Sequence, residues 1–158
     1  MDIIINWIQV KPTLKDFFII ASVSIVSMHV WCFLLGNAFL KMNWIEEEKR
    51  FNTFGENIIF SFLEENLSRL IPIMITMEIW GFGKMLFLVI ILSSFIFGIV
   101  HGYFACIFLQ GIWGIVFSVI FLKFGGLYQE YITAWISVSI IHSVYNMPVN
   151  YFKKRAYG

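Results

Sequence analysis

The sequence predicts an all-α fold, a polytopic bundle of about five membrane-spanning helices that forms one integral-membrane domain over residues 1–158. Of the 158 residues, 59% are hydrophobic and only 13% are charged, and the mean hydropathy is +0.81. Soluble domains carry about 25% charged residues, so this chain has too little polar surface for a soluble globule. A soluble enzyme is therefore excluded, and the net charge of +1 also argues against a nucleic-acid-binding protein.

The N-terminal part, residues 1–55, contains an interfacial lead-in, the first span and a charged loop. Residues 17–40 contain no Asp, Glu, Lys or Arg, and such a run can cross hydrocarbon as a helix. Residues 1–12 lack the basic start of a signal peptide and place Trp7 among isoleucines, which favours a segment at the membrane surface. Residues 41–53 hold the densest charge in the chain and are expected to form a solvated loop.

The second span, at about residues 53–80, is unusual because ionisable side chains lie well inside it: Glu64, Glu65, Arg69 and Glu78. Asn52 or Thr53 is expected to cap this helix at its start. Pro72 has no backbone N–H, so the Ser68 carbonyl should lose its helical partner. We therefore expect a kink just past Arg69.

Three further spans follow from the long apolar run at residues 85–122, which has no Asp, Glu, Lys or Arg and is too long for one crossing. The chain must fold back within it, around residues 102–106. Gly111 and Gly114 form a small-residue face that allows close helix packing, and Gly125 with Gly126 predicts a turn. The spans are expected at about residues 85–103, 107–124 and 128–148.

The distribution of basic residues predicts the orientation of the spans. With five spans the two termini lie on opposite sides of the membrane. The side of the C-terminus holds Lys41, Lys49, Arg50, Lys153, Lys154 and Arg155, whereas the other side holds Lys11, Lys15, Lys84 and Lys123. The positive-inside rule therefore places the C-terminus and the loop between spans one and two in the cytoplasm.

Three clusters of polar residues lie within the spans, where each ionisable group is costly and needs an explanation. They occupy residues 64–69, 97–101 and 142–146. Each contains a pair four residues apart, which stacks on one helix face: Glu65 with Arg69, Phe97 with His101, and His142 with Asn146. Because spans two, three and five reach the same membrane side at these clusters, we expect one shared pocket that opens toward the cytoplasmic face.

A purely structural explanation also exists for each cluster taken alone. Glu65 and Arg69 can form an ion pair, and buried histidines can bond to backbone carbonyls. Several such groups at one depth favour a functional pocket instead, because their desolvation costs add and one salt bridge offsets only one of them.

Polar residues outside the clusters are expected to have structural roles. His29 has no ionisable neighbour on its helix face, which favours packing. Glu78 lies about 21 Å along the helix from Glu64, so we expect it near the opposite interface with Lys84. Cys32 and Cys106 lie inside apolar runs and predict neither a disulfide framework nor a zinc site.

The order and spacing of the clusters resemble the three-motif pattern of the CPBP intramembrane proteases, the group that includes the CAAX-processing proteases and bacterial abortive-infection or bacteriocin-immunity proteins. The pattern reads Glu64-Glu65-x-x-x-Arg69, Phe97-x-x-x-His101 and His142-x-x-x-Asn146, and the resemblance covers residues 56–147 as a catalytic core. The sequence departs from the family at Leu70, where many relatives have glycine, and it is shorter than the eukaryotic-type members.

Peptide hydrolysis requires an activated water and donors that stabilise the oxyanion on the carbonyl. Arg69 should hold Glu65 ionised, whereas Glu64 lacks an obvious cation and is expected to be the base. The resemblance implies the same division of roles. Glu64 and His101 would activate water, His142 and Asn146 would donate to the oxyanion, the Glu65–Arg69 pair would brace the helix, and Phe97 would pack.

No cofactor is favoured, although a metal design stays open. The sequence contains no His-Glu-x-x-His zinc motif and no Gly-x-Ser-x-Gly nucleophile motif. Glu64, His101 and His142 could still hold zinc or another divalent metal with one position open to water. The resemblance favours the glutamate mechanism without a metal.

We therefore expect an intramembrane endopeptidase that hydrolyses a peptide or a protein tail near the cytoplasmic membrane face. The alternative is a non-catalytic immunity protein or an accessory protein of a peptide export or sensing system. The CAAX-type members suggest a prenylated substrate, whereas the small size and the Ile- and Phe-rich composition resemble a bacterial member in the cytoplasmic membrane, for which an unlipidated peptide is at least as well expected. Beyond the substrate and the lipid bilayer, a membrane protein partner or a second copy of the chain stays open.

Overall fold

The computed structural model describes residues 2–41, 53–101 and 104–157, and all regular secondary structure in this part of the chain is helical, as the sequence predicts. Most of the predicted charged loop at residues 41–53 lies outside the described residues. The elements in chain order are α1 (Asp2–Gln9), α2 (Leu14–Lys41), α3 (Phe54–Glu65), η1 (Asn66–Leu70), α4 (Ile71–Trp80), α5 (Lys84–Val100), α6 (Phe104–Cys106), η2 (Ile107–Gly111), α7 (Ile112–Lys123), η3 (Gly126–Tyr128) and α8 (Tyr131–Tyr157).

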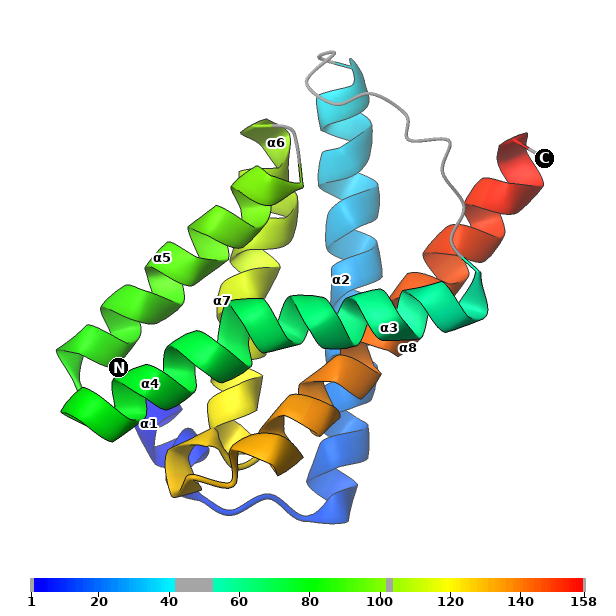
Figure 1. The fold of residues 1–158 in the computed structure, drawn as a ribbon. Coiled ribbons are helices and arrows are strands. Elements are labelled where there is room, and N and C mark those ends of the chain that lie inside the picture. The colour runs from blue at the N-terminus through cyan, green and yellow to red at the C-terminus, as the bar shows by residue number, and fades with distance from the viewer. Residues whose placement is uncertain (1, 42–52, 102–103, 158) are drawn as a thin grey trace.

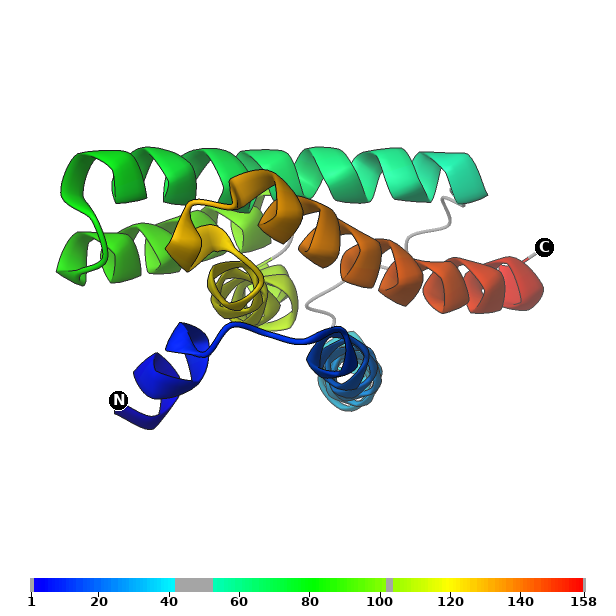
Figure 2. The ribbon, with the colours of Figure 1, turned by 90° about the horizontal axis from the view of Figure 1, so that it is seen from below.

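The helices form a bundle in which α3, α4 and α5 lie on one side and α1 and α2 on the other (Figures 1 and 2). The helix α7 lies between these two groups, and α8 runs beside α3 and also contacts α2 and α7. The helices agree with the predicted spans to within a few residues, except that α8 continues beyond the predicted end at residue 148. Two described segments, Leu14–Phe39 and Phe104–Lys123, are long and apolar enough to cross a membrane, and Lys84–Val100 is a shorter apolar helix.

The segments α3, η1 and α4 make one continuous helix that carries the acidic residues of the second span (Figure 1). It begins with a capping box in which the Thr53 backbone N–H donates to the Glu56 carboxylate at 2.7 Å and the Glu56 N–H donates to the Thr53 hydroxyl. Of the two predicted caps, Thr53 is therefore the one used. Such a cap satisfies backbone donors that the first helical turn leaves unpaired.

A turn of π-helix, η1, lies where the sequence predicts a kink, directly before Pro72. The backbone N–H of Ile71 donates to the Asn66 carbonyl, five residues earlier, instead of to the residue four earlier. A π turn adds one residue to the helical turn, and it lies directly before Pro72, whose missing N–H removes one helical bond. In the view of Figure 1, α4 is inclined to α3. Ser68 and Arg69 both lie within this π turn.

Close packing between α5 and the following segments depends on glycine. A Cβ on Gly98 would lie 2.7 Å from the Ile107 Cα, and a Cβ on Gly114 would lie 2.9 Å from the Ser94 Cβ. Gly111 also approaches Ser94, so the predicted small-residue face of Gly111 and Gly114 is confirmed. Gly98 is a contact that the sequence pattern did not indicate. These contacts hold the His101 end of α5 against η2.

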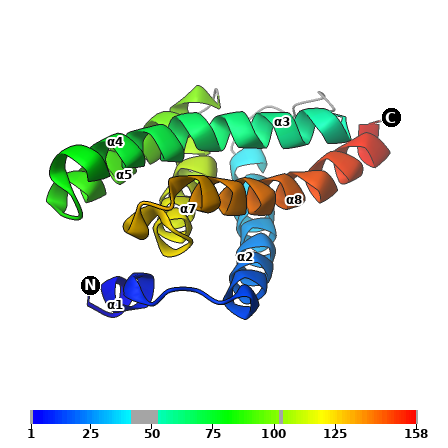
Figure 3. The ribbon, with the colours of Figure 1, turned by 60° about the horizontal axis from the view of Figure 1, so that its bottom comes forward.

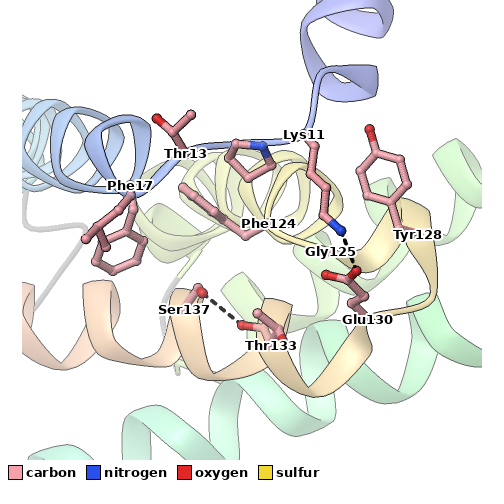
Figure 4. Close-up of a pocket in the computed structure, with 11 residues that line it drawn as sticks. Lys11, Thr13, Phe17, Phe124, Gly125, Tyr128, Glu130, Thr133 and Ser137 are labelled. Atoms are coloured by element: carbon pink, nitrogen blue, oxygen red, sulfur yellow. Dashed lines mark hydrogen bonds and ion pairs between the residues drawn. The ribbon is translucent and has the colours of Figure 1, made fainter.

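The N-terminal helix α1 packs against α7 and is bonded to η3. The buried Lys123 ammonium donates to the carbonyls of Trp7 and Val10, and the Tyr128 hydroxyl donates to the Gln9 carbonyl. Nearby, Lys11 forms an ion pair with Glu130 at 2.8 Å. Both residues line a cavity of about 280 Å³ (Figure 4). The hydrogen bond and the charge of Glu130 raise the pKa of Lys11.

Candidate functional site

The three predicted clusters meet where the end of α3, the end of α5 and the middle of α8 come together. Glu64 and Glu65 are the last residues of α3, His101 follows the last residue of α5, and His142 lies within α8. The structure thus brings two carboxylates and two imidazoles from three helices into one place. The i,i+4 spacing within each helix and the common depth of the clusters had predicted this meeting.

Glu65 and Arg69 form the predicted ion pair, and the pair is almost fully buried. The Arg69 Nη1 donates to the Glu65 Oε1 at 2.7 Å, and both side chains are 1% exposed. The same Nη1 also donates to the Ser68 hydroxyl at 2.7 Å. The guanidinium lies over two aromatic rings, with its Cζ 4.6 Å from the centre of Phe97 and 5.5 Å from that of Phe117. These aromatic faces stabilise the buried cation.

Glu65 has a second partner that the sequence did not indicate. The His142 Nδ1 lies 2.8 Å from the same Glu65 Oε1 that accepts from Arg69. Because Glu65 is paired with Arg69, its oxygen acts as the acceptor and the His142 Nδ1 as the donor. The pair predicted to brace one helix therefore also orients an imidazole on α8. In the described part of the chain, the Glu65 Oε2 and the Arg69 Nε and Nη2 have no hydrogen-bond partner.

Glu64 lies beside this buried network, is 35% exposed, and faces both histidines. Its Oε2 lies 3.6 Å from the His142 Nε2, and its Oε1 lies 4.0 Å from the His101 Nε2. Both distances exceed the usual 2.7–3.2 Å of an N–H···O hydrogen bond, so each contact is longer than a direct hydrogen bond. Glu64 is the more accessible of the two carboxylates, since Glu65 is 1% exposed.

The protonation of both imidazoles follows from their Nδ1 contacts. The His101 Nδ1 lies 2.7 Å from the Phe97 carbonyl oxygen, which can only accept, so this Nδ1 carries the proton. The His142 Nδ1 carries a proton for Glu65 in the same way. In the neutral form of either ring the Nε2 is then an acceptor, and it donates only when the ring is an imidazolium. In both histidines, the nitrogen that gains or loses the proton is therefore Nε2, and this atom faces Glu64.

Asn146 lies one turn beyond His142 on α8, and its amide contacts α3. The Asn146 Nδ2 donates to the Ser61 hydroxyl at 3.1 Å, and Ser61 is fully buried. Ser61 is four residues before Glu65, so α3 presents both on the face that meets α8. That spacing could have identified Ser61 from the sequence. Phe117, whose ring also lies 5.5 Å from the His142 ring, has no comparable local signal.

Two other polar residues have the structural roles expected of them, with one correction. The His29 Nδ1 bonds to the Ile25 carbonyl at 2.7 Å, and its ring packs 4.7 Å from that of Tyr145, between α2 and α8. Glu78 accepts a hydrogen bond of 2.9 Å from the Tyr131 hydroxyl. The expected partner Lys84 forms no ion pair with Glu78 in the described residues, and the partner that the structure shows is Tyr131, the first residue of α8.

A groove of about 300 Å³ opens next to Glu64 and His101, between α5 and the η1–α4 segment. Its walls are mainly apolar, with Leu67, Pro72, Ile96 and Val100 among them. In the part of the chain that the structure describes, no group of three or more His, Cys, Asp or Glu side chains is arranged to hold a metal ion. No family model, curated protein or solved structure matches the chain.

Proposed function

We propose that the protein is an intramembrane endopeptidase of the CPBP type that hydrolyses a peptide or a protein tail near the cytoplasmic membrane face. One observation carries this proposal: the Nε2 atoms of two histidines face the half-buried Glu64 carboxylate at 3.6 and 4.0 Å, and the Nδ1 of each ring is already bonded elsewhere. A carboxylate and an imidazole that can contact the same water molecule are groups that general base catalysis of hydrolysis uses.

The membrane setting rests on where the apolar and the charged side chains lie. Large apolar side chains of α2, such as Phe33 and Leu34, are more than half exposed, whereas Glu65 and Arg69 are buried between helices. A soluble protein would show the opposite arrangement. The continuous helix from Phe54 to Trp80 is about 40 Å long at 1.5 Å per residue, which exceeds the roughly 30 Å of a bilayer core. We propose five spans with a cytoplasmic C-terminus, in a bacterial cytoplasmic membrane.

In the proposed reaction Glu64 removes a proton from a water molecule that it shares with His101, and the resulting hydroxide attacks the substrate carbonyl. The tetrahedral intermediate then collapses, the C–N bond breaks, and the proton taken by Glu64 passes to the leaving amine. His142, as an imidazolium, and Asn146 would donate to the oxyanion. The Glu65–Arg69 pair holds His142 in the orientation that this role needs.

We favour this design over a metal site formed by Glu64, His101 and His142. The spacing of Asn146 from His142 favours the glutamate design, because an amide one turn away suits an oxyanion donor and is a poor zinc ligand. In the structure one N–H of the Asn146 amide donates to Ser61, so the second N–H would serve the oxyanion. A protein that only binds a peptide, as an immunity or accessory protein would, could use the same pocket without turnover. The two cases differ in whether Glu64 is required for bond cleavage.

The proposal is tested by comparing the peptides found in membranes that carry the wild type, Glu64→Gln or Glu78→Gln. Both variants make the same change on the same continuous helix, but Glu78 bonds to Tyr131, away from the two histidines. We expect cleavage products with the wild type and with Glu78→Gln, and their loss with Glu64→Gln. If the same products appear in the Glu64→Gln membranes, Glu64 does not catalyse their formation, and the peptide-binding role replaces the enzymatic one.

A further inference from the structure

The groove beside Glu64 runs along two antiparallel helices, from the proposed catalytic pair to a point two helical turns away. Glu64 and His101 lie at one end, Ser68 and Phe97 in the middle, and Pro72 with Ser93 at the other end. The separation of eight positions between Ser93 and His101 corresponds to about 12 Å of helix. The groove therefore reaches from the site toward the interior of the proposed membrane.

The outer rim of the groove is apolar and open to the side of the bundle. Leu67, Ile96 and Val100 are 70%, 59% and 76% exposed. In a bilayer these side chains face lipid, so a substrate can reach Glu64 sideways, between α5 and the η1–α4 segment.

The polar atoms along the groove are already bonded within their own helices. The Ser68 hydroxyl donates to the Glu64 carbonyl, and the Ser93 hydroxyl donates to the Ile90 carbonyl at 3.2 Å. A polar side chain in the groove would give up its hydrogen bonds to water for few new ones, which is costly. An apolar side chain loses no such bonds. The volume of about 300 Å³ is at the lower end of the roughly 300–1,000 Å³ that is usual for ligand pockets.

The geometry points to a substrate-binding subsite: the groove holds the apolar side chain, of the size of Leu, Ile or Phe, of the residue next to the scissile bond of a peptide. This inference rests on the proposed function, since Glu64 and His101 at one end of the groove fix where the bond is cut. It adds the substrate class, a peptide with a large apolar residue at the cleavage position. Ser93 and Ile96 would determine the size of the residue accepted.

The test uses the purified full-length protein in lipid nanodiscs with a synthetic random-sequence peptide library, read by mass spectrometry, and a prenylated set as a second arm. The wild type is expected to cut beside Leu, Ile or Phe. Ser93→Phe fills the far end of the groove and should lower kcat/KM for peptides with Phe or Leu at this position at least tenfold relative to Ala, since one misfit in a specificity pocket changes rates about 10–200-fold. Leu92→Phe, on an exposed neighbouring position, is the matched control and should keep the wild-type profile.

A second variant covers the case in which Ser93→Phe does not fold. Ile96→Ala removes part of the groove wall and should shift the preference toward larger residues such as Trp. An unchanged profile in the folded groove variants, or cleavage of prenylated peptides alone, would overturn the subsite while the protease proposal stands.

A binding measurement separates the subsite from the proposed chemistry. Library peptides with a photoreactive benzophenone side chain should crosslink Glu64→Gln protein at Leu67 or Ile96. If the wild type cleaves nothing but these crosslinks form, the proposed hydrolysis fails and the groove stands as a peptide-binding site. If neither cleavage nor crosslinking at these residues occurs, both proposals are overturned.

Discussion

Glu65 shows, at the scale of single residues, which contacts local spacing predicts and which it does not. The Arg69 contact lies within one continuous helix, so the i,i+4 pattern was enough to predict it. The His142 contact joins α3 to α8, across 77 positions of sequence, and no local pattern contains it. The sequence therefore indicated that two carboxylates and two histidines meet: Glu64, Glu65, His101 and His142. Asn146, which was predicted for the same pocket, contacts Ser61. The sequence did not indicate that one carboxylate, Glu65, holds both Arg69 and His142 while Glu64 is left to face the two Nε2 atoms.

The buried network predicts the effect of removing Glu65. Glu65→Ala leaves the Arg69 guanidinium without its carboxylate, and breaking a buried ion pair in this way costs about 3–5 kcal/mol. Thermal unfolding in detergent should show the loss. The double variant Glu65→Ala with Arg69→Met removes the stranded charge and should recover part of the stability. A single variant as stable as the wild type would mean that the pair contributes nothing to folding.

At the scale of helices, the sequence predicted the five helical regions and the cap at Thr53 but not the form of the irregular turns. The missing N–H of Pro72 could be foreseen, whereas its accommodation by a π turn depends on packing against α5 and α8. The close approach at Gly98 depends in the same way on where η2 lies. Helix lengths follow from local composition, and such adjustments follow from neighbours that are distant in sequence.

The close contact at Gly98 predicts a steric effect. In Gly98→Ala the new Cβ would lie 2.7 Å from the Ile107 Cα, which is backbone and cannot rotate away. Overpacking of this kind costs about 1–3 kcal/mol. Gly36→Ala in α2 meets nothing within 4 Å and should leave the stability equal or slightly higher. Melting temperatures of the two variants provide the comparison, and equal values would show that α5 can move away from η2 at no cost.

At the scale of the whole molecule, two described segments that are long and apolar enough to cross a membrane agree with the proposed membrane setting. The N-terminal helix α1 and the end of α8 lie on different sides of the bundle (Figure 3). Glu65 and Arg69 are buried together between helices and Lys123 is buried against α1, whereas exposed apolar side chains lie along α2 and α5. Composition predicted the membrane class. Hydropathy could not predict the position of α1, which depends on the hydrogen bond from Lys123 of α7 to the Trp7 carbonyl.

The proposed topology predicts the accessibility of two positions. In a background with Cys32 and Cys106 replaced by Ala, single cysteines at Lys84 and Arg155 should react with a membrane-impermeant thiol reagent from opposite sides. Arg155→Cys should react only after the cytoplasmic face is exposed. Labelling of both positions from the same side of sealed vesicles would contradict the five-span arrangement.

The most direct measurement is the cleavage rate of a library-derived peptide by purified protein after exhaustive chelation, for the wild type, Glu64→Gln and Asn146→Ala. The glutamate mechanism predicts that the chelated wild type stays active. We expect Glu64→Gln to lose about 10²–10⁴-fold in rate and Asn146→Ala to lose about 10²–10³-fold in kcat with little change in KM. Activity that disappears on chelation, returns with zinc and is nearly normal in Asn146→Ala would contradict it, as would a Glu64→Gln variant as fast as the wild type.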